Sequence, residues 1–157
     1  MSDDLPLYAK AALAKWGEAT IQTTHGEKPT AVVMLAVFGA ESGGTWDRRT
    51  RGDSIAELAA WPESQAMVRE CNCVGYGSWG APQIFMPVHA AWLKEQTGVD
   101  SPCFWAAWLC EVPHAVEAAA VILASQGPGA WSTYTGGEWL AHLAQAQAAY
   151  AAAKEAA

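Results

Sequence analysis

Residues 31–40 read Ala-Val-Val-Met-Leu-Ala-Val-Phe-Gly-Ala, and Glu-Ser-Gly-Gly follows directly at residues 41–44. The first ten residues carry no charge, so a helix made from them has no polar face and should be buried on all sides. Thr30 can serve as the N-cap, and either glycine can adopt the left-handed conformation in which helices end. The stretch therefore predicts a buried central helix with Glu41 in its last turn.

Glu41 stands where a negative charge is unfavourable. The carbonyl end of the helix dipole repels a carboxylate, and apolar surroundings remove the water that would solvate it. Both effects favour the neutral carboxylic acid, which is the form that a general acid needs. A helix-end glutamate that turns outward into solvent has no such chemistry, and the local sequence leaves both interpretations open.

Composition and charge restrict the class of protein. The chain has 157 residues, of which 52% are apolar and 16% are charged, so we expect one domain over residues 1–157 with a real core. Its net charge is −7, and its nine Lys and Arg residues form no basic stripe. This pattern argues against nucleic acid as a partner. No uncharged run is long enough to span a bilayer, so we expect no membrane insertion.

Helical periodicity and capping signals predict a mostly helical domain. Besides the central helix, the expected helices cover residues 5–16, 54–61, 62–70, 87–96, 102–112, 113–125 and 139–150. We expect residues 17–29 to be a polar connection and residues 131–137 to be a loop. Residues 71–84 are rich in glycine and predict a loop or small hairpin, the only extended region expected.

The four cysteines leave three states open: disulfides, free thiols or a four-thiolate metal site. Cys103 and Cys110 are seven residues apart, about 10 Å along one helix, which is too far for a bridge between them. Any bridge would link this helix to Cys71 or Cys73. The spacing Cys-x-Cys is not the usual zinc motif, and the four histidines form no ligand pair, so we predict no metal and no other cofactor.

Two catalytic motifs fail on inspection. Residues 75–80 match G-x-G-x-x-G, but no hydrophobic strand precedes them and no helix can open directly after them, which argues against dinucleotide binding. Ser78 lacks the glycine two positions upstream that a nucleophile elbow requires.

Three segments, in the right order, resemble one known family. The Glu-Ser-Gly-Gly of residues 41–44 resembles the catalytic E-S motif of lysozyme-like lytic transglycosylases and goose-type lysozymes. Residues 78–84, Ser-Trp-Gly-Ala-Pro-Gln-Ile, resemble the family's S-x-G-L-M-Q-I loop. Residues 131–137 resemble the W-x-x-Y-x-x-G ending of phage-associated members. The resemblance covers about residues 30–140.

The resemblance implies a fold, a substrate and a set of site residues. The fold would be a lysozyme-like orthogonal helical bundle around a buried central helix, with at most a small hairpin near residues 71–84. The substrate would be peptidoglycan, cleaved at the β-1,4 bond between N-acetylmuramic acid and N-acetylglucosamine, with Glu41 as the acid that protonates the glycosidic oxygen. Ser78 and Gln83 would hold the sugar's acetamido group near Glu41. Trp79 and Tyr134 would be sugar platforms, although buried packing explains either ring equally well.

Two departures from the family pattern leave the outcome of the reaction open. The family's A-Y-N-x-G segment is replaced by Ala-Ser-Gln-Gly-Pro at residues 124–128, and the Leu-Met of the loop is replaced by Ala-Pro. An inverting hydrolysis needs a second carboxylate, for which Asp47, Asp53 and Glu57 are the nearest candidates in sequence. Transglycosylation assisted by the acetamido group needs none.

Charge and the first residues suggest how such an enzyme would reach its substrate. The chain begins Met-Ser-Asp-Asp, which is acidic where a secretory signal would be basic, so we expect synthesis in the cytoplasm without a signal peptide. An acidic protein gains nothing from attraction to an anionic wall, so we expect delivery by a phage tail, as a virion component, or by another secretion apparatus. The alternatives are a non-catalytic structural or glycan-binding module on the same fold and a related glycosidase that acts on chitin.

Overall fold

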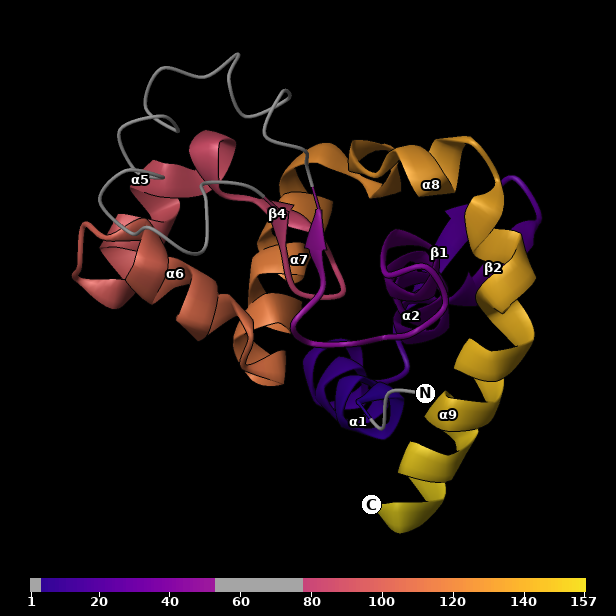
Figure 1. Cartoon of the computed structure of the whole chain (residues 1–157). Helices are drawn as coiled ribbons and strands as arrows, with labels where there is room; N and C mark the ends of the chain where they lie inside the picture. Colours follow the sequence, from indigo (N-terminus) through magenta and orange to yellow (C-terminus); the bar gives the residue numbers. More distant parts are fainter. Residues whose placement is uncertain (1–3, 53–77) are drawn as a thin grey trace.

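The computed structural model describes residues 4–52 and 78–157, and this part of the chain is mainly helical with two small antiparallel sheets (Figure 1). The helices are α1 (Leu5–Trp16), α2 (Thr30–Glu41), α5 (Met86–Thr97), α6 (Pro102–Leu109), α7 (Val112–Gln126), α8 (Ser132–Thr135) and α9 (Leu143–Ala156), with 3-10 turns η1 (Pro128–Ala130) and η2 (Glu138–His142). The strands are β1 (Thr20–Thr23), β2 (Gly26–Pro29), β3 (Arg51–Gly52), β4 (Ser78–Trp79) and β5 (Ile84–Phe85). The helices expected over 54–61 and 62–70 lie outside the described residues.

Helix α2 is the centre of the fold, as the sequence predicts. Every residue from 30 to 39 is buried, and none is more than 6% exposed. Helices α1, α8 and α9 and the turn η2 pack against it (Figure 1). The helix begins at Thr30 and ends at Glu41, after which Gly43 and Gly44 both adopt positive φ, 66° and 82°. The predicted burial, start and stop of this helix are confirmed. The N-cap prediction was wrong, because Thr30 is the first helical residue, Pro29 occupies the N-cap position and no side chain caps this end.

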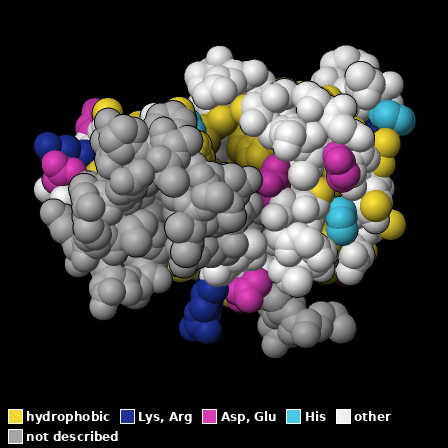
Figure 2. Space-filling model, turned by 45° about the horizontal axis from the view of Figure 1, so that its top comes forward, with side chains coloured by type: hydrophobic (Ala, Val, Ile, Leu, Met, Phe, Trp, Pro, Cys, Tyr) yellow, Lys and Arg dark blue, Asp and Glu magenta, His cyan; other side chains and the backbone are white. Residues whose placement is uncertain are grey.

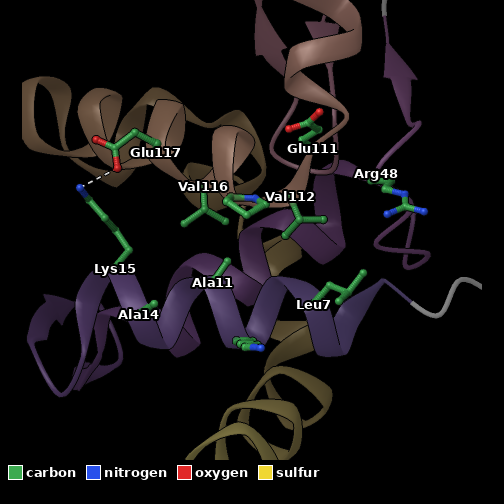
Figure 3. A pocket seen from close by; sticks show the side chains of 11 residues that line it. Leu7, Ala11, Ala14, Lys15, Arg48, Glu111, Val112, Val116 and Glu117 are labelled. Carbon is green, nitrogen blue, oxygen red and sulfur yellow. Dashed lines mark ion pairs between the residues drawn. The ribbon is translucent and has the colours of Figure 1, made fainter. Parts of the chain in front are cut away.

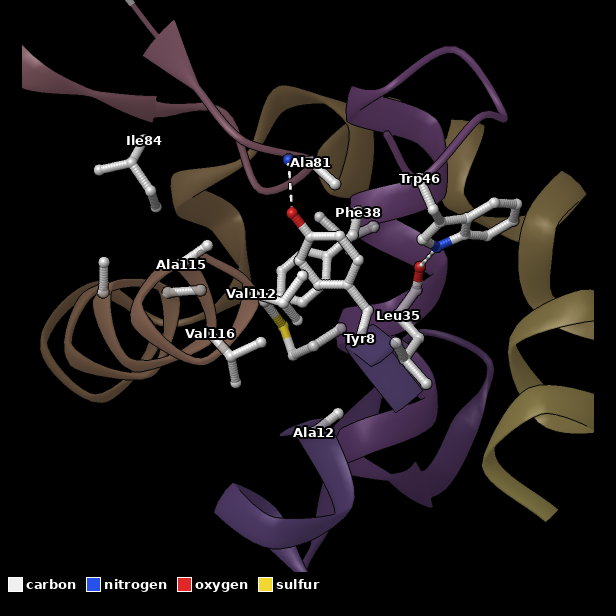
Figure 4. Close-up of a cluster of buried hydrophobic side chains, with 14 of the residues drawn as sticks. Tyr8, Ala12, Leu35, Phe38, Trp46, Ala81, Ile84, Val112, Ala115 and Val116 are labelled. Carbon is white, nitrogen blue, oxygen red and sulfur yellow. Dashed lines mark hydrogen bonds between the residues drawn. The ribbon is translucent and has the colours of Figure 1, made fainter. Parts of the chain in front are cut away.

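The chain leaving α2 folds back onto the helix that it has just left. The Trp46 indole is 2% exposed, and its Nε1 donates a hydrogen bond of 2.8 Å to the carbonyl of Leu35 (Figure 4). Its ring lies so close to Gly39 that a Cβ there would be 2.3 Å from the Trp46 ring. Gly39 is therefore required by packing, because any larger residue would meet the indole.

A hairpin precedes α2 where the sequence predicted only a polar connection. Strands β1 and β2 are antiparallel, with Thr20 opposite Pro29 and Thr23 opposite Gly26. The turn is stabilised by the Thr23 hydroxyl, which donates to the Gly26 carbonyl at 2.7 Å, and by the positive φ of Gly26. The prediction that extended structure occurs only near residues 71–84 was therefore wrong, because local turn chemistry outweighs the polarity of this segment.

A second sheet has the order β3-β4-β5 and contains the described part of the expected hairpin near residues 71–84. In its register, Gly52 lies opposite Ser78, and Ser78 lies opposite Phe85. The turn from β4 to β5 has positive φ at Gly80 and, less usually for a residue with a side chain, at Gln83. This turn belongs to the segment that resembles the family's loop.

The C-terminal half follows the predicted helices over α5, α6 and α7. The helix expected over residues 139–150 differs, because residues 138–142 form the 3-10 turn η2 and α9 runs from Leu143 to Ala156. Ser101 caps α6 by accepting a hydrogen bond from the Phe104 amide, and Gly98 ends α5 in the left-handed conformation. The segment 131–137, predicted to be a loop, contains the single helical turn α8. Within the described ranges, no single helix is long and apolar enough to cross a membrane; α6 and α7 reach that length only together, across a bend of 100°.

Candidate active site

Glu41 is the last residue of α2 and is partly buried. Its Oε1 accepts a hydrogen bond of 2.9 Å from the hydroxyl of Thr133, which lies 92 residues later on α8. The carboxyl therefore faces another element of the fold instead of turning freely into solvent.

Ser42 fixes the backbone on which Glu41 stands. The Ser42 hydroxyl is buried and donates to the carbonyl of Phe38 at 2.7 Å, in the last turn of α2. The same oxygen accepts a hydrogen bond of 2.9 Å from the backbone amide of Trp46. The Phe38 carbonyl also accepts a hydrogen bond of 3.0 Å from the Ser42 backbone amide, so the hydroxyl adds a second bond at this helix end while it ties down the following loop. The serine next to the candidate acid is thus a structural residue.

Helix α8 is held in place by aromatic residues on both sides of Thr133. Trp131 is buried, and its Nε1 donates a hydrogen bond of 2.9 Å to the carbonyl of Pro82, in the β4–β5 turn. Tyr134 stacks on Trp139 with ring centroids 5.3 Å apart. A single helical turn cannot hold its own position in water, so these contacts supply what the turn lacks. They bring the end of α2, the β4–β5 turn and the segment 131–137 together.

The Gln83 side chain stabilises the β4–β5 turn to which it belongs. Its Nε2 donates hydrogen bonds to the carbonyls of Gly80 at 2.9 Å and Thr50 at 3.2 Å. The side chain also lies against Gly52, where a Cβ would come within 1.9 Å of the Gln83 Oε1. The amide nitrogen is engaged with backbone, and a contact between Gln83 and a sugar stays a prediction.

The two predicted sugar platforms differ in their surroundings. Trp79 is 9% exposed, and Ser78 beside it in β4 is 8% exposed, so both side chains are largely enclosed by the protein. This favours packing over sugar stacking for Trp79, because a stacking ring needs an open face. Tyr134 is partly buried and has one face against Trp139. The roles of Ser78, Trp79 and Tyr134 toward substrate stay predictions.

Of the three candidate second carboxylates, the structure describes one. The Oδ1 of Asp47 accepts a hydrogen bond of 2.8 Å from the amide of Arg49, and its backbone carbonyl accepts one from the amide of Thr50. Asp47 therefore organises the turn that leads to β3. Asp53 and Glu57 lie outside the described residues.

Sequence reasoning missed a residue that contacts the candidate acid. Thr133 occupies an unspecified position of the W-x-x-Y-x-x-G pattern, so the pattern signals the segment but not the hydroxyl. It also missed His142, whose ring meets Trp46 edge-on, with ring centroids 5.6 Å apart, and lies against Gly44 at the exit of α2.

The molecular surface has a hollow on the face shown in Figure 2, with hydrophobic side chains on its floor and an acidic side chain at its margin. A separate cavity of about 680 Å³ lies between α1 and α7 (Figure 3). Its lining is largely apolar, and its two carboxylates are already paired, Glu117 with Lys15 and Glu111 with His114. Glu41 does not line this second cavity, and we assign no acid–base chemistry to it.

The cysteines are in a mixed state. Cys103 is disulfide-bonded, whereas Cys110 is a free and partly buried thiol whose pKa is raised by burial. A site that uses all four cysteines as metal thiolates does not fit this arrangement. Cys71 and Cys73 lie outside the described residues. Within the described residues, no three His, Cys, Asp or Glu side chains are grouped as they would be to hold a metal ion.

Comparison with known proteins gives no further support, because no protein-family model, curated protein or solved structure matches this chain. The interpretation of the site therefore rests on its own geometry and on the motifs of the sequence.

Proposed function

We propose that this chain is a peptidoglycan-cleaving glycosidase on a lysozyme-like fold, with Glu41 as its general acid. The observation that carries the proposal is the position of the Glu41 carboxyl. It leaves the end of a fully buried helix and meets Thr133, where α8 is joined to the β4–β5 turn by the bond from Trp131 to Pro82. The three segments that resemble the lytic transglycosylase family are the segments that converge there.

The chemistry requires one proton transfer at the start. Protonated Glu41 gives its proton to the glycosidic oxygen as the bond from that oxygen to the anomeric carbon breaks, and positive charge develops on the sugar ring. Attack by water then yields a reducing end, and attack by the sugar's own C6 hydroxyl yields a 1,6-anhydro end. A hydrolase that needs a second carboxylate would draw on Asp47, Asp53 or Glu57, of which Asp47 already accepts one backbone hydrogen bond in its own turn.

The charge of the chain bears on its delivery. A net charge of −7 opposes free diffusion to an anionic cell wall. We therefore place the enzyme on a larger carrier, such as a phage tail or a secretion apparatus, that brings it to the glycan strand.

The first test is the clearing of purified cell walls by the wild type and by Glu41→Gln. We expect the substitution to lower the clearing rate by about 10²-fold or more, because the amide cannot donate the proton that the leaving group needs. Glu95→Gln is a suitable control, since Glu95 is an exposed carboxylate on α5.

The control should clear walls at the wild-type rate. If Glu41→Gln also clears walls at that rate, Glu41 is not the general acid. If the wild type binds walls in sedimentation without clearing them, the chain is a glycan-binding module instead of an enzyme.

A further inference from the structure

We infer that Thr133 is a positioning residue for Glu41: the Thr133 hydroxyl holds one carboxyl oxygen of the candidate general acid in place. The inference rests on the proposed function, because it assigns Thr133 a part in the same reaction. It comes from a contact between α2 and α8 that no motif of the sequence specifies.

The geometry of the contact suits this role. The Thr133 Oγ1 is 2.9 Å from the Glu41 Oε1, and both side chains are partly buried. The Thr133 hydroxyl donates to a carboxylate oxygen, and it can still donate to the carbonyl oxygen of a carboxylic acid whose proton is on the other oxygen, so Thr133 is able to hold Glu41 before and after proton transfer.

Positioning matters here because a glutamate side chain at a helix end has many rotamers. Confining such a side chain costs side-chain conformational entropy each time that it reaches the reactive geometry. A bond already present in the folded protein removes much of that cost before the substrate binds. The expected consequence is a change in the rate of the chemical step, with little change in the affinity for glycan.

Thr133 can act as an anchor because its own position is fixed. Trp131 ties the start of α8 to the Pro82 carbonyl, Tyr134 stacks on Trp139, and Gly137 follows the turn with a φ of 84°. The hydroxyl therefore reaches Glu41 from a turn that is held at both ends.

Three substitutions separate positioning from packing. Thr133→Val keeps the shape of the side chain and removes the hydroxyl, whereas Thr133→Ser keeps the hydroxyl and removes the methyl group. Thr135→Val is the matched control, because Thr135 lies exposed on the same helical turn and its hydroxyl donates to the Ser132 carbonyl instead.

Steady-state cleavage of a defined peptidoglycan tetrasaccharide is the first measurement. We expect Thr133→Val to lower kcat about tenfold, with KM within about twofold of the wild type, as removal of one charge-assisted hydrogen bond predicts. Thr133→Ser should recover most of kcat, and Thr135→Val should match the wild type.

Titration of the Glu41 side-chain carboxyl by ¹³C NMR is the second measurement, with the signal assigned by its loss in Glu41→Gln. Loss of the hydroxyl donor disfavours the ionised form, so the midpoint in Thr133→Val should move about one unit to higher pH. The other titratable groups on α8 and η2 are Tyr134, Glu138 and His142, and all three are unchanged in the variants.

The outcomes distinguish this inference from the proposed function. Full activity in Thr133→Val beside an inactive Glu41→Gln overturns the inference alone. Equal losses in Thr133→Val and Thr133→Ser, or a loss confined to KM, also overturn it, because each indicates packing or binding instead of positioning. A wild-type chain that leaves the tetrasaccharide intact overturns the proposed function and the inference with it.

Discussion

At the scale of single residues, the site depends on side chains that have no catalytic role of their own. The Ser42 hydroxyl joins Phe38 to the Trp46 amide, and the Trp46 indole then returns to the carbonyl of Leu35. These bonds fix the backbone on either side of Glu41. The contact from Thr133 then holds the carboxyl of the acid itself.

Gly39 gives a prediction at this scale. In an exposed helix, Gly→Ala stabilises by about 1 kcal/mol, but here the new Cβ would lie 2.3 Å from the buried Trp46 ring. We expect the clash to win, so Gly39→Ala should lower the free energy of unfolding by about 1–3 kcal/mol. Urea denaturation measures this change in the free energy of unfolding. An increase in stability would show that Trp46 moves aside without cost, and the packing described for this helix end would be wrong.

At the scale of elements, α8 is the part of the site that depends most on its neighbours. It is one helical turn, and its place is set by Trp131 on the β4–β5 turn and by Tyr134 on Trp139. Its contact with α2 connects the candidate acid to the segment 131–137 and, through Trp131, to the β4–β5 turn.

Trp131→Phe tests this dependence, because it keeps an aromatic ring and removes the Nε1 donor to the Pro82 carbonyl. We expect a stability loss of about 1–2 kcal/mol and a fall in wall clearing of several fold, since α8 also carries Thr133. Trp108→Phe, in α6, is the control and should keep its activity. Unchanged clearing in Trp131→Phe would mean that α8 is positioned by other contacts.

The elements also show how much of the fold could be predicted from the sequence. Helix α1 has apolar residues at helical spacing, and α2 is an uncharged run that two glycines close, so their bounds were predicted almost to the residue. The β1–β2 hairpin was missed because the segment is polar and shows no apolar alternation. Its turn depends on one hydrogen bond, from the Thr23 hydroxyl to the Gly26 carbonyl. The bond between Glu41 and Thr133 could not be predicted, because it joins residues 92 apart at a position that the motif leaves free.

At the scale of the whole molecule, the site region is also supported from the opposite side, by α1. The Tyr8 side chain is fully buried, and its hydroxyl accepts a hydrogen bond of 3.1 Å from the Ala81 amide in the β4–β5 turn (Figure 4). Burial raises the pKa of Tyr8 well above its ordinary value, so the hydroxyl stays neutral under all ordinary conditions. The N-terminal helix thus contributes to the same turn as Trp131.

Two tyrosine substitutions test this long-range support. Tyr8→Phe leaves the Ala81 amide without its acceptor, and Tyr150→Phe removes a comparable bond, from the Tyr150 hydroxyl to the Gly17 carbonyl. We expect each to cost about 1–3 kcal/mol of stability, and only Tyr8→Phe to reduce wall clearing at a temperature where both are folded. Equal wall clearing by the two variants would show that the bond from Ala81 to Tyr8 is not needed for catalysis.

The central claim is that Glu41 protonates a glycosidic bond of peptidoglycan, and mass spectrometry of the fragments released from purified cell walls tests it most directly. The wild type should release fragments with new N-acetylmuramic acid ends, either reducing or 1,6-anhydro, and Glu41→Gln should release none above background. Fragments whose new reducing end is N-acetylglucosamine, or the same new muramic acid ends from Glu41→Gln, would contradict the claim.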